Sequence, residues 1–241
     1  MDNSVRDLAQ DAIAQCVSTV MRSRHAVRAF RQKAVGRSVV EAILADASSA
    51  PSGANIQPWR VYVVAGKVKD ELGDALVAAS RAGAMSAPEH FPDPLPDVFQ
   101  VRLQDFGARY YASLNIERTD AAARTRQSER NLHFFGAPVG LIFAIDRRLK
   151  PHSWIDLGLF AQSVMIAAKA RGLDTCPQVS FAPFHSVIAE HLQLPPEEVT
   201  AFGMSMGYGD PQSAVNQTTM PRERVQDFAR IAGFPQEQFQ S

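Results

Sequence analysis

Residues 50–59 read APSGANIQPW and lie between two segments of regular pattern. Residues 39–50 have apolar side chains at helical spacing, and residues 61–65 form a short apolar run that predicts a strand. Three side chains of the stretch carry hydroxyl or amide groups: Ser52, Asn55 and Gln57. Proline and glycine favour an irregular loop here. Such a loop suits a flat ligand with a hydrogen-bonding edge, although an ordinary turn between a helix and a strand would have the same composition.

Outside this loop, helical and strand patterns follow one another without regular alternation. Expected helices cover residues 5–21, 39–50, 67–82, 106–130, 153–171, 184–192 and 222–232, and expected strands cover 61–65, 139–146 and 200–208. Expected helix caps are Ser38 with Glu41, and Ser153 with Asp156. A doubly wound sheet needs strands and helices in strict alternation, so the order favours an α+β fold with one domain over residues 1–241.

Residues 85–105 hold a cluster of prolines at positions 88, 92, 94 and 96. A long irregular insert of this kind is typical of a lid, a binding loop or disorder. We expect residues 85–105 to be a loop, and residues 85–130 to act as an insert that controls access to a substrate site.

The bulk composition excludes several classes of protein. The formal net charge is zero and the pI is near 7, so nothing indicates nucleic acid or an anionic membrane as a partner. No apolar run approaches the roughly 20 residues that span a bilayer. Two distant cysteines form neither a disulfide framework nor a zinc cluster, and the N-terminus lacks the pattern of a signal peptide. A cytoplasmic protein is the simplest interpretation.

Two groups of arginines could bind an anion. Residues 21–37 contain six basic residues and no acid, with Arg24 and Arg28 four positions apart. Arg222 and Arg224 lie next to Pro221, in a stretch without helical pattern. Guanidinium groups match the geometry of phosphate, but a solvated basic surface would give the same patterns.

The sequence shows no catalytic group of its own. It lacks the glycine-rich nucleotide motifs, the HExxH metal motif and the GxSxG nucleophile motif. Cys176, within CPQVS, has no evident partner for nucleophilic catalysis, and the six-residue spacing of His185 and His191 argues against a metal site. If the protein is an enzyme, a bound cofactor therefore carries the chemistry.

Several segments taken together resemble the nitroreductase family, from about residue 21 to residue 228. The segments are SRHAVRAF (23–30), APSGANIQPW (50–59), RNLHFFGAPVGLIFAIDRRL (130–149), SWIDLGLFAQSVMIAAKARGLDTCPQ (153–178), GYGDPQSAVN (207–216) and PRERV (221–225). Within the family, LDTCPQ and FFGAPVGLIF look most like the branch of nitrobenzoate and dinitroaniline reductases.

The resemblance implies a central, mostly antiparallel sheet wrapped by helices, in an interlocked homodimer with two FMN molecules at the interface. It implies a ping-pong mechanism, in which NADH or NADPH reduces the flavin by hydride transfer and a nitroaromatic or similar electron-poor small molecule then takes the electrons. Alternatives on the same scaffold are an ene-reductase, a reductive dehalogenase, an azoline oxidase and a flavin-fragmenting enzyme. A flavin-binding module without turnover, or a flavin-free interaction protein, also remains open.

The resemblance also implies roles for individual residues. Those expected at the phosphate and ribityl end of FMN are Arg24, His25, Ala26, Arg222 and Arg224. Those expected around the ring are Arg28 near N1 and O2, Pro177, Gln178, Val179 and Ser180, with the Val179 N–H toward N5, and Asn131. Those expected to reach the flavin of the partner chain are Pro51, Ser52, Gly53, Asn55 and Gln57. Ala26 departs from the serine common in the family, which removes one hydroxyl donor worth about 1 kcal/mol.

Overall fold

The computed structural model describes residues 3–85 and 91–234, with side chains of the first helix from residue 9 onward. The helices are α1 (Asn3–Ser23), α2 (Arg37–Ala47), α3 (Gly66–Arg81), α4 (Asp97–Ser113), α5 (Ala121–Leu132), α6 (Pro151–Ala170), α7 (His185–Leu192), α8 (Ala214–Gln217) and α9 (Val225–Phe228). The strands are β1 (Trp59–Ala65), β2 (Val139–Asp146), β3 (Asp174–Gln178) and β4 (Glu198–Gly207). Three short 3-10 turns complete the order: η1 (Gly53–Asn55), η2 (Phe134–Gly136) and η3 (Val179–Phe184).

The four strands form one antiparallel sheet in the order β1-β2-β4-β3, which confirms the expected α+β fold with a central antiparallel sheet. The strand β2 lies inside the sheet and is buried along almost its whole length. Leu141 and Phe143 face the side covered by α2 and α6, whereas Ile142 and Ala144 face the side covered by α3 and α7. Burial of both faces explains why VGLIFAI is continuously apolar rather than alternating.

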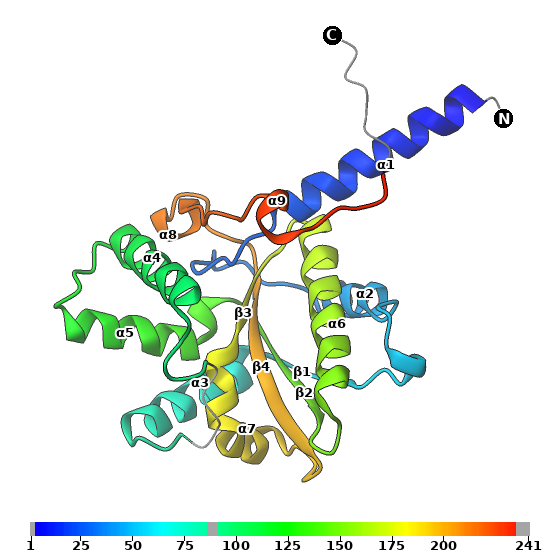
Figure 1. Ribbon diagram of the computed structural model, residues 1–241. Coiled ribbons are helices and arrows are strands. Elements are labelled where there is room, and N and C mark those ends of the chain that lie inside the picture. The colour runs from blue at the N-terminus through cyan, green and yellow to red at the C-terminus, as the bar shows by residue number, and fades with distance from the viewer. Residues whose placement is uncertain (1–2, 86–90, 235–241) are drawn as a thin grey trace.

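Figure 1 shows the sheet at the centre, with α6 and α2 on one side and α3 and α7 on the other. The helices α4 and α5 lie together beyond α3, and α1 extends away from the body of the chain. The apolar stripe of α1 is open in the single chain, with Ile13, Val17 and Met21 each more than half exposed.

Several expectations about element ends were wrong. The helix α2 begins at Arg37 after Gly36, without the capping box of Ser38, because Glu41 pairs with Arg37 at 2.6 Å instead. The helix α6 begins at Pro151, without side-chain caps from Ser153 or Asp156. Proline suits the first turn of a helix because its missing N–H has no partner there.

The expected loop at 85–105 is helical from Asp97 onward, and residues 86–90, including Pro88, lie outside the described residues. The remaining prolines of the cluster all precede α4, and the last of them, Pro96, is the residue before its first turn. None of them therefore interrupts the helix. The expected single helix at 106–130 is two helices, α4 and α5, separated by residues 114–120. The last helix covers only Val225–Phe228, and β3 was not expected at all.

Candidate functional site

A cavity of about 310 Å³ lies between α4, α5 and the end of β3. Its lining residues are Arg28, Phe106, Tyr110, Tyr111, Gln127, Ser128, Asn131, Phe135, Cys176, Pro177, Gln178, Val179 and Ser180. Segments distant in the sequence thus meet at one place, and Arg28, Asn131 and the whole of 177–180 are among the residues predicted to hold a cofactor.

Hydrogen bonds lock the polar side chains at one wall of this cavity. The Gln178 side chain is 4% exposed, and its Nε2 donates to the backbone oxygen and to Oδ1 of Asn131, both at 2.7 Å. The Asn131 Nδ2 in turn donates to the Ser180 hydroxyl at 2.7 Å, and the Ser205 hydroxyl lies 2.7 Å from Gln178 Oε1. The hydrogen-bonding groups of the Gln178 amide are therefore all used within the protein, and they hold Asn131 in position. The next residue, Val179, is 49% exposed to solvent.

Arg28 forms part of the wall together with aromatic side chains of α4. Its guanidinium carbon lies 5.3 Å from the Phe106 ring centroid and 5.0 Å from that of Tyr110. The Tyr110 hydroxyl accepts a hydrogen bond from Gln127 at 2.7 Å, which fixes the ring. Among the described residues, no carboxylate pairs with Arg28, so its charge stays available to a ligand.

The sequence reasoning missed Phe106, Tyr110 and Tyr111, which it assigned only to a polar helix. Phe106 and Tyr110 are four positions apart, a spacing that places both on one face of a helix and could have indicated an aromatic face.

The cysteine of the cavity is buried and inert. Burial raises the pKa of the Cys176 thiol to about 11, and nearby Arg28 only partly offsets this effect. The thiol is therefore protonated at neutral pH, which agrees with the weak case for a nucleophile made from the sequence.

Two of the predicted phosphate-binding arginines lie close together. The pKa of Arg24 is lowered, first by burial and then by the positive charge of Arg222. Arg224 instead pairs with Asp227 through both nitrogens of its fork, at 2.9 and 3.1 Å. His25 is exposed and lies 3.1 Å from the Ser23 carbonyl oxygen, and Ala26 bridges to Thr175. A half-buried arginine beside a second cation is repelled by it, and a bound anion would reduce that repulsion.

The loop at 51–57 does not join the cavity within one chain. The Gly53 N–H donates to Asp156 of α6 at 3.2 Å, and the Gln57 N–H donates to the Ser52 hydroxyl at 3.0 Å. The loop lies on the α6 side of the sheet, away from α4 and α5 (Figure 1). Asn55 and Gln57 have φ values of 57° and 48°, in the left-handed region, so the loop is tightly shaped while its surface stays exposed.

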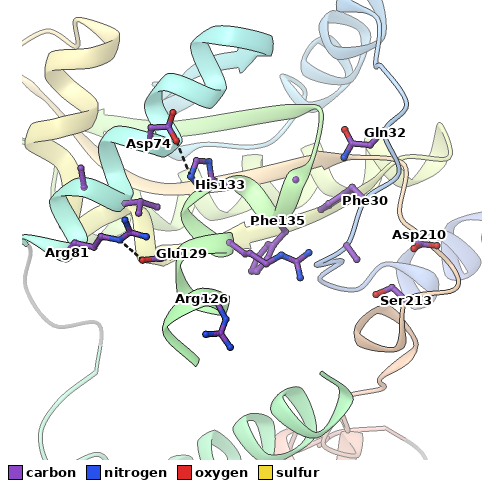
Figure 2. Close-up of a pocket in the computed structure, with 15 residues that line it drawn as sticks. Phe30, Gln32, Asp74, Arg81, Arg126, Glu129, His133, Phe135, Asp210 and Ser213 are labelled. Carbon is purple, nitrogen blue, oxygen red and sulfur yellow. Dashed lines mark hydrogen bonds and ion pairs between the residues drawn. The ribbon is translucent and has the colours of Figure 1, made fainter. Parts of the chain in front are cut away.

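A larger cavity, of about 820 Å³, lies on the far side of α5 (Figure 2). Four of its polar side chains contact one another: Arg81 pairs with Glu129 at 2.7 Å, and the His133 Nε2 lies 3.5 Å from Asp74. None of the predicted site residues lines it. The smaller cavity is therefore the candidate site.

Within residues 3–85 and 91–234, His, Cys, Asp and Glu side chains form no group of three or more that could hold a metal ion. In the same part of the chain, no helix combines the length and apolar character needed to cross a membrane.

The chain is similar to several known proteins. The chain matches the nitroreductase family over residues 21–208. It is 43% identical to a 4-nitrobenzoate reductase of Pseudomonas putida, over 89% of this chain and 95% of that protein. It is 39% identical to a nitrobenzene nitroreductase of Ectopseudomonas oleovorans, over 88% and 95% of the two chains.

Among solved structures, it is similar to an FMN-dependent nitroreductase of Mycobacterium smegmatis in complex with NADPH, with a TM-score of 0.88 and 32% identity over 92% of this chain and 100% of that one. The resemblance drawn from the sequence, including the likeness to nitrobenzoate reductases, is thereby confirmed, and the chain belongs to the nitroreductase family.

Proposed function

We propose that the chain is an FMN-dependent NAD(P)H oxidoreductase that reduces nitroaromatic or similarly electron-poor small molecules. The observation that carries the proposal is the cavity in which Arg28, Asn131 and residues 177–180 meet beside an aromatic wall. The relatives named above are nitroreductases, and the solved relative from M. smegmatis is FMN-dependent and was found with NADPH.

The residues present fit FMN. Burial and then the positive charge of Arg222 lower the pKa of Arg24, and a phosphate between the two arginines would offset both effects. The buried Thr175 hydroxyl oxygen has no partner among the described residues, and Thr175 bridges to Ala26, the position where the resemblance implies a serine. At the other end, residues 177–180 and Arg28 would border the ring, and His25 and Arg224 stay predictions for the phosphate end.

A homodimer is part of the proposal, because one chain leaves the loop at 51–57 apart from the cavity. Apolar side chains that a partner could cover lie open on α1, at Ile13, Val17 and Met21. They also lie open on α6, at Ile155 and Leu159. In such a dimer Pro51, Ser52, Gly53, Asn55 and Gln57 would reach the cofactor of the partner chain, which accounts for a shaped but exposed polar loop.

When bound, FMN would supply the two-electron chemistry that links NAD(P)H to the acceptor. The chain's own residues would supply binding and electrostatics: Arg28, held against Phe106 and Tyr110, would place a positive charge beside the ring and favour its anionic reduced form. A nitro group, one NAD(P)H and one proton give a nitroso group, NAD(P)⁺ and water. A second NAD(P)H and proton give the hydroxylamine.

We further propose that residues 1–241 act as one domain, in which 85–130 form the insert that borders substrate access. The support is that α4 and α5, within this insert, line the cavity. A cytoplasmic location is proposed because that compartment supplies NADH and NADPH.

The test is the visible spectrum of the purified protein under anaerobic conditions. We expect flavin absorbance that bleaches with NADPH or NADH and returns when a nitroarene is added. A yellow protein that neither nicotinamide bleaches would instead indicate a flavin-binding module. Recovery with an enone or a halogenated arene, but not with a nitroarene, would favour the ene-reductase or dehalogenase alternatives. A colourless protein that ignores added FMN would refute the proposal.

A further inference from the structure

The helix α5 presents different side chains to two cavities. Gln127, Ser128 and Asn131 line the small cavity of the candidate site. Arg126 and Glu129 line the large cavity on the opposite side, where Figure 2 labels both. Residues three, four and seven positions apart share one face of a helix, so Arg124 lies on the same face as the first three.

Arg124 is fixed at the edge of the small cavity by an aromatic ring. Its guanidinium carbon lies 3.8 Å from the centroid of Tyr111, and Tyr111 is itself a lining residue. Stacking uses the flat face of the guanidinium and leaves the in-plane N–H donors free for an acceptor. The structure thus holds a forked donor in place beside the cavity.

No anion of the protein neutralises this donor. Within residues 3–85 and 91–234, no carboxylate forms an ion pair or side-chain hydrogen bond with Arg124. On α4, by contrast, Arg109 pairs with Asp105 at 2.8 Å. Among the described residues, the cavity lining contains Arg28 and no carboxylate, so the charge that they give the cavity is positive.

A ligand that fits these features is a flat ring carrying an anionic group at its rim. Phe106, Tyr110 and Tyr111 give the cavity an aromatic wall, and in-plane guanidinium donors match a carboxylate in forked geometry. We propose that the preferred electron acceptors are electron-poor aromatic carboxylates, whose carboxylate is bound by Arg124. This proposal rests on the proposed function, and it assigns Arg124 as the residue that selects the substrate class.

The experiment compares reduction of 4-nitrobenzoate with reduction of nitrobenzene, its neutral counterpart, by the holoenzyme. In Arg124→Gln, kcat/KM for 4-nitrobenzoate should fall by about tenfold. This is the low end of the loss expected for a charge-assisted hydrogen bond, because Arg124 is partly exposed and solvent weakens the bond. The value for nitrobenzene should stay within about twofold. Arg126→Gln, on the other face of α5, is the matched control and should change neither value.

A binding measurement accompanies the kinetics. Benzoate, which cannot be reduced, should perturb the flavin absorbance of the wild type, with an apparent Kd that rises by about tenfold in Arg124→Gln and less in Arg124→Lys. An equal fall for both nitro compounds, or an unchanged benzoate Kd, would overturn the assignment. If the wild type reduced neither compound, the proposed function would fail, and the benzoate titration would still decide whether Arg124 binds a carboxylate.

Discussion

Replacement of Gln178 by leucine should destabilise the protein and disturb the wall of the cavity at the same time. The side chain is 4% exposed and makes three contacts at 2.7 Å, two with oxygens of Asn131 and one with the Ser205 hydroxyl. Leucine has a similar volume but no polar group, so the fold should be kept while these partners lose their bonds.

The magnitude follows from what each partner can do afterwards. A buried polar group left unpaired costs about 1–3 kcal/mol. Asn131 borders the cavity, where water can reach its oxygens, and Ser205 can donate instead to the Phe134 carbonyl oxygen at 2.8 Å. We therefore expect a loss of about 2–3 kcal/mol in the free energy of unfolding rather than three full penalties. For a chain of this length, that corresponds to a fall in Tm of about 4–12 °C.

The measurement is thermal and urea unfolding at one protomer concentration, because assembly and cofactor binding both shift Tm. Gln104→Leu is the matched control, since Gln104 is exposed on α4, and its Tm should stay within about 1 °C of the wild type. FMN retention after dialysis should fall in Gln178→Leu only, because Asn131 and Ser180 lose their fixed positions. If Tm fell by less than about 2 °C, the view that the hydrogen bonds of Gln178 stabilise this wall would be refuted.

Three further predictions concern other buried or polar groups. Tyr62→Phe removes the hydrogen bond from the Tyr62 hydroxyl to Glu198 at 2.8 Å and should cost about 1 kcal/mol in urea unfolding. Burial, and then Glu198, raise the pKa of Tyr62 to about 12. Above pH 10 the unfolded state therefore loses this proton first, so the wild type should lose stability between about pH 10 and 12 more steeply than Tyr62→Phe, and parallel profiles would count against the assignment. Thr175→Val should leave the free energy of unfolding of the FMN-free protein unchanged or raise it by up to about 1 kcal/mol, because the Thr175 hydroxyl has no partner among the described residues; a clear loss would mean that it has one. In a Cys16→Ser variant, the remaining thiol, Cys176, should react with a thiol reagent only after unfolding, and rapid labelling of the native protein would contradict its burial.

The sheet could be predicted from the sequence only where burial leaves a pattern. The strand β2 is covered on both faces and shows as an unbroken apolar run. The strand β3 has no such run, and Pro177 within it argues against a strand. It forms because β4 offers an open edge, with Cys176 opposite Ser205, and an edge strand tolerates proline where no ladder bond is needed. Tertiary pairing of this kind leaves no trace in the five residues themselves.

The candidate site was predictable as a set of parts but not as an assembly. The resemblance pointed to Arg28 and to residues 177–180, and the fold brings them to one cavity. The Gln178 side chain turns inward to Asn131 rather than outward, because β3 places it on the buried face of the sheet. Such a choice of face depends on strand register, which a segment without alternation does not reveal.

The polar character of α5 has a physical cause that its sequence alone conceals. A helix with arginine, glutamine, serine and glutamate on most of its surface would ordinarily be taken for one that faces solvent. Here the helix separates two cavities, so both of its long faces border polar space, and only positions such as Leu132 pack into the core. Arg124 and Arg126 differ by two positions and in sequence look interchangeable, yet one stacks on Tyr111 at the candidate site and the other lines the opposite cavity. If α5 only provided a charged surface, the two arginine variants should behave alike toward 4-nitrobenzoate; if it separates two environments, only Arg124→Gln should discriminate between the charged and the neutral acceptor.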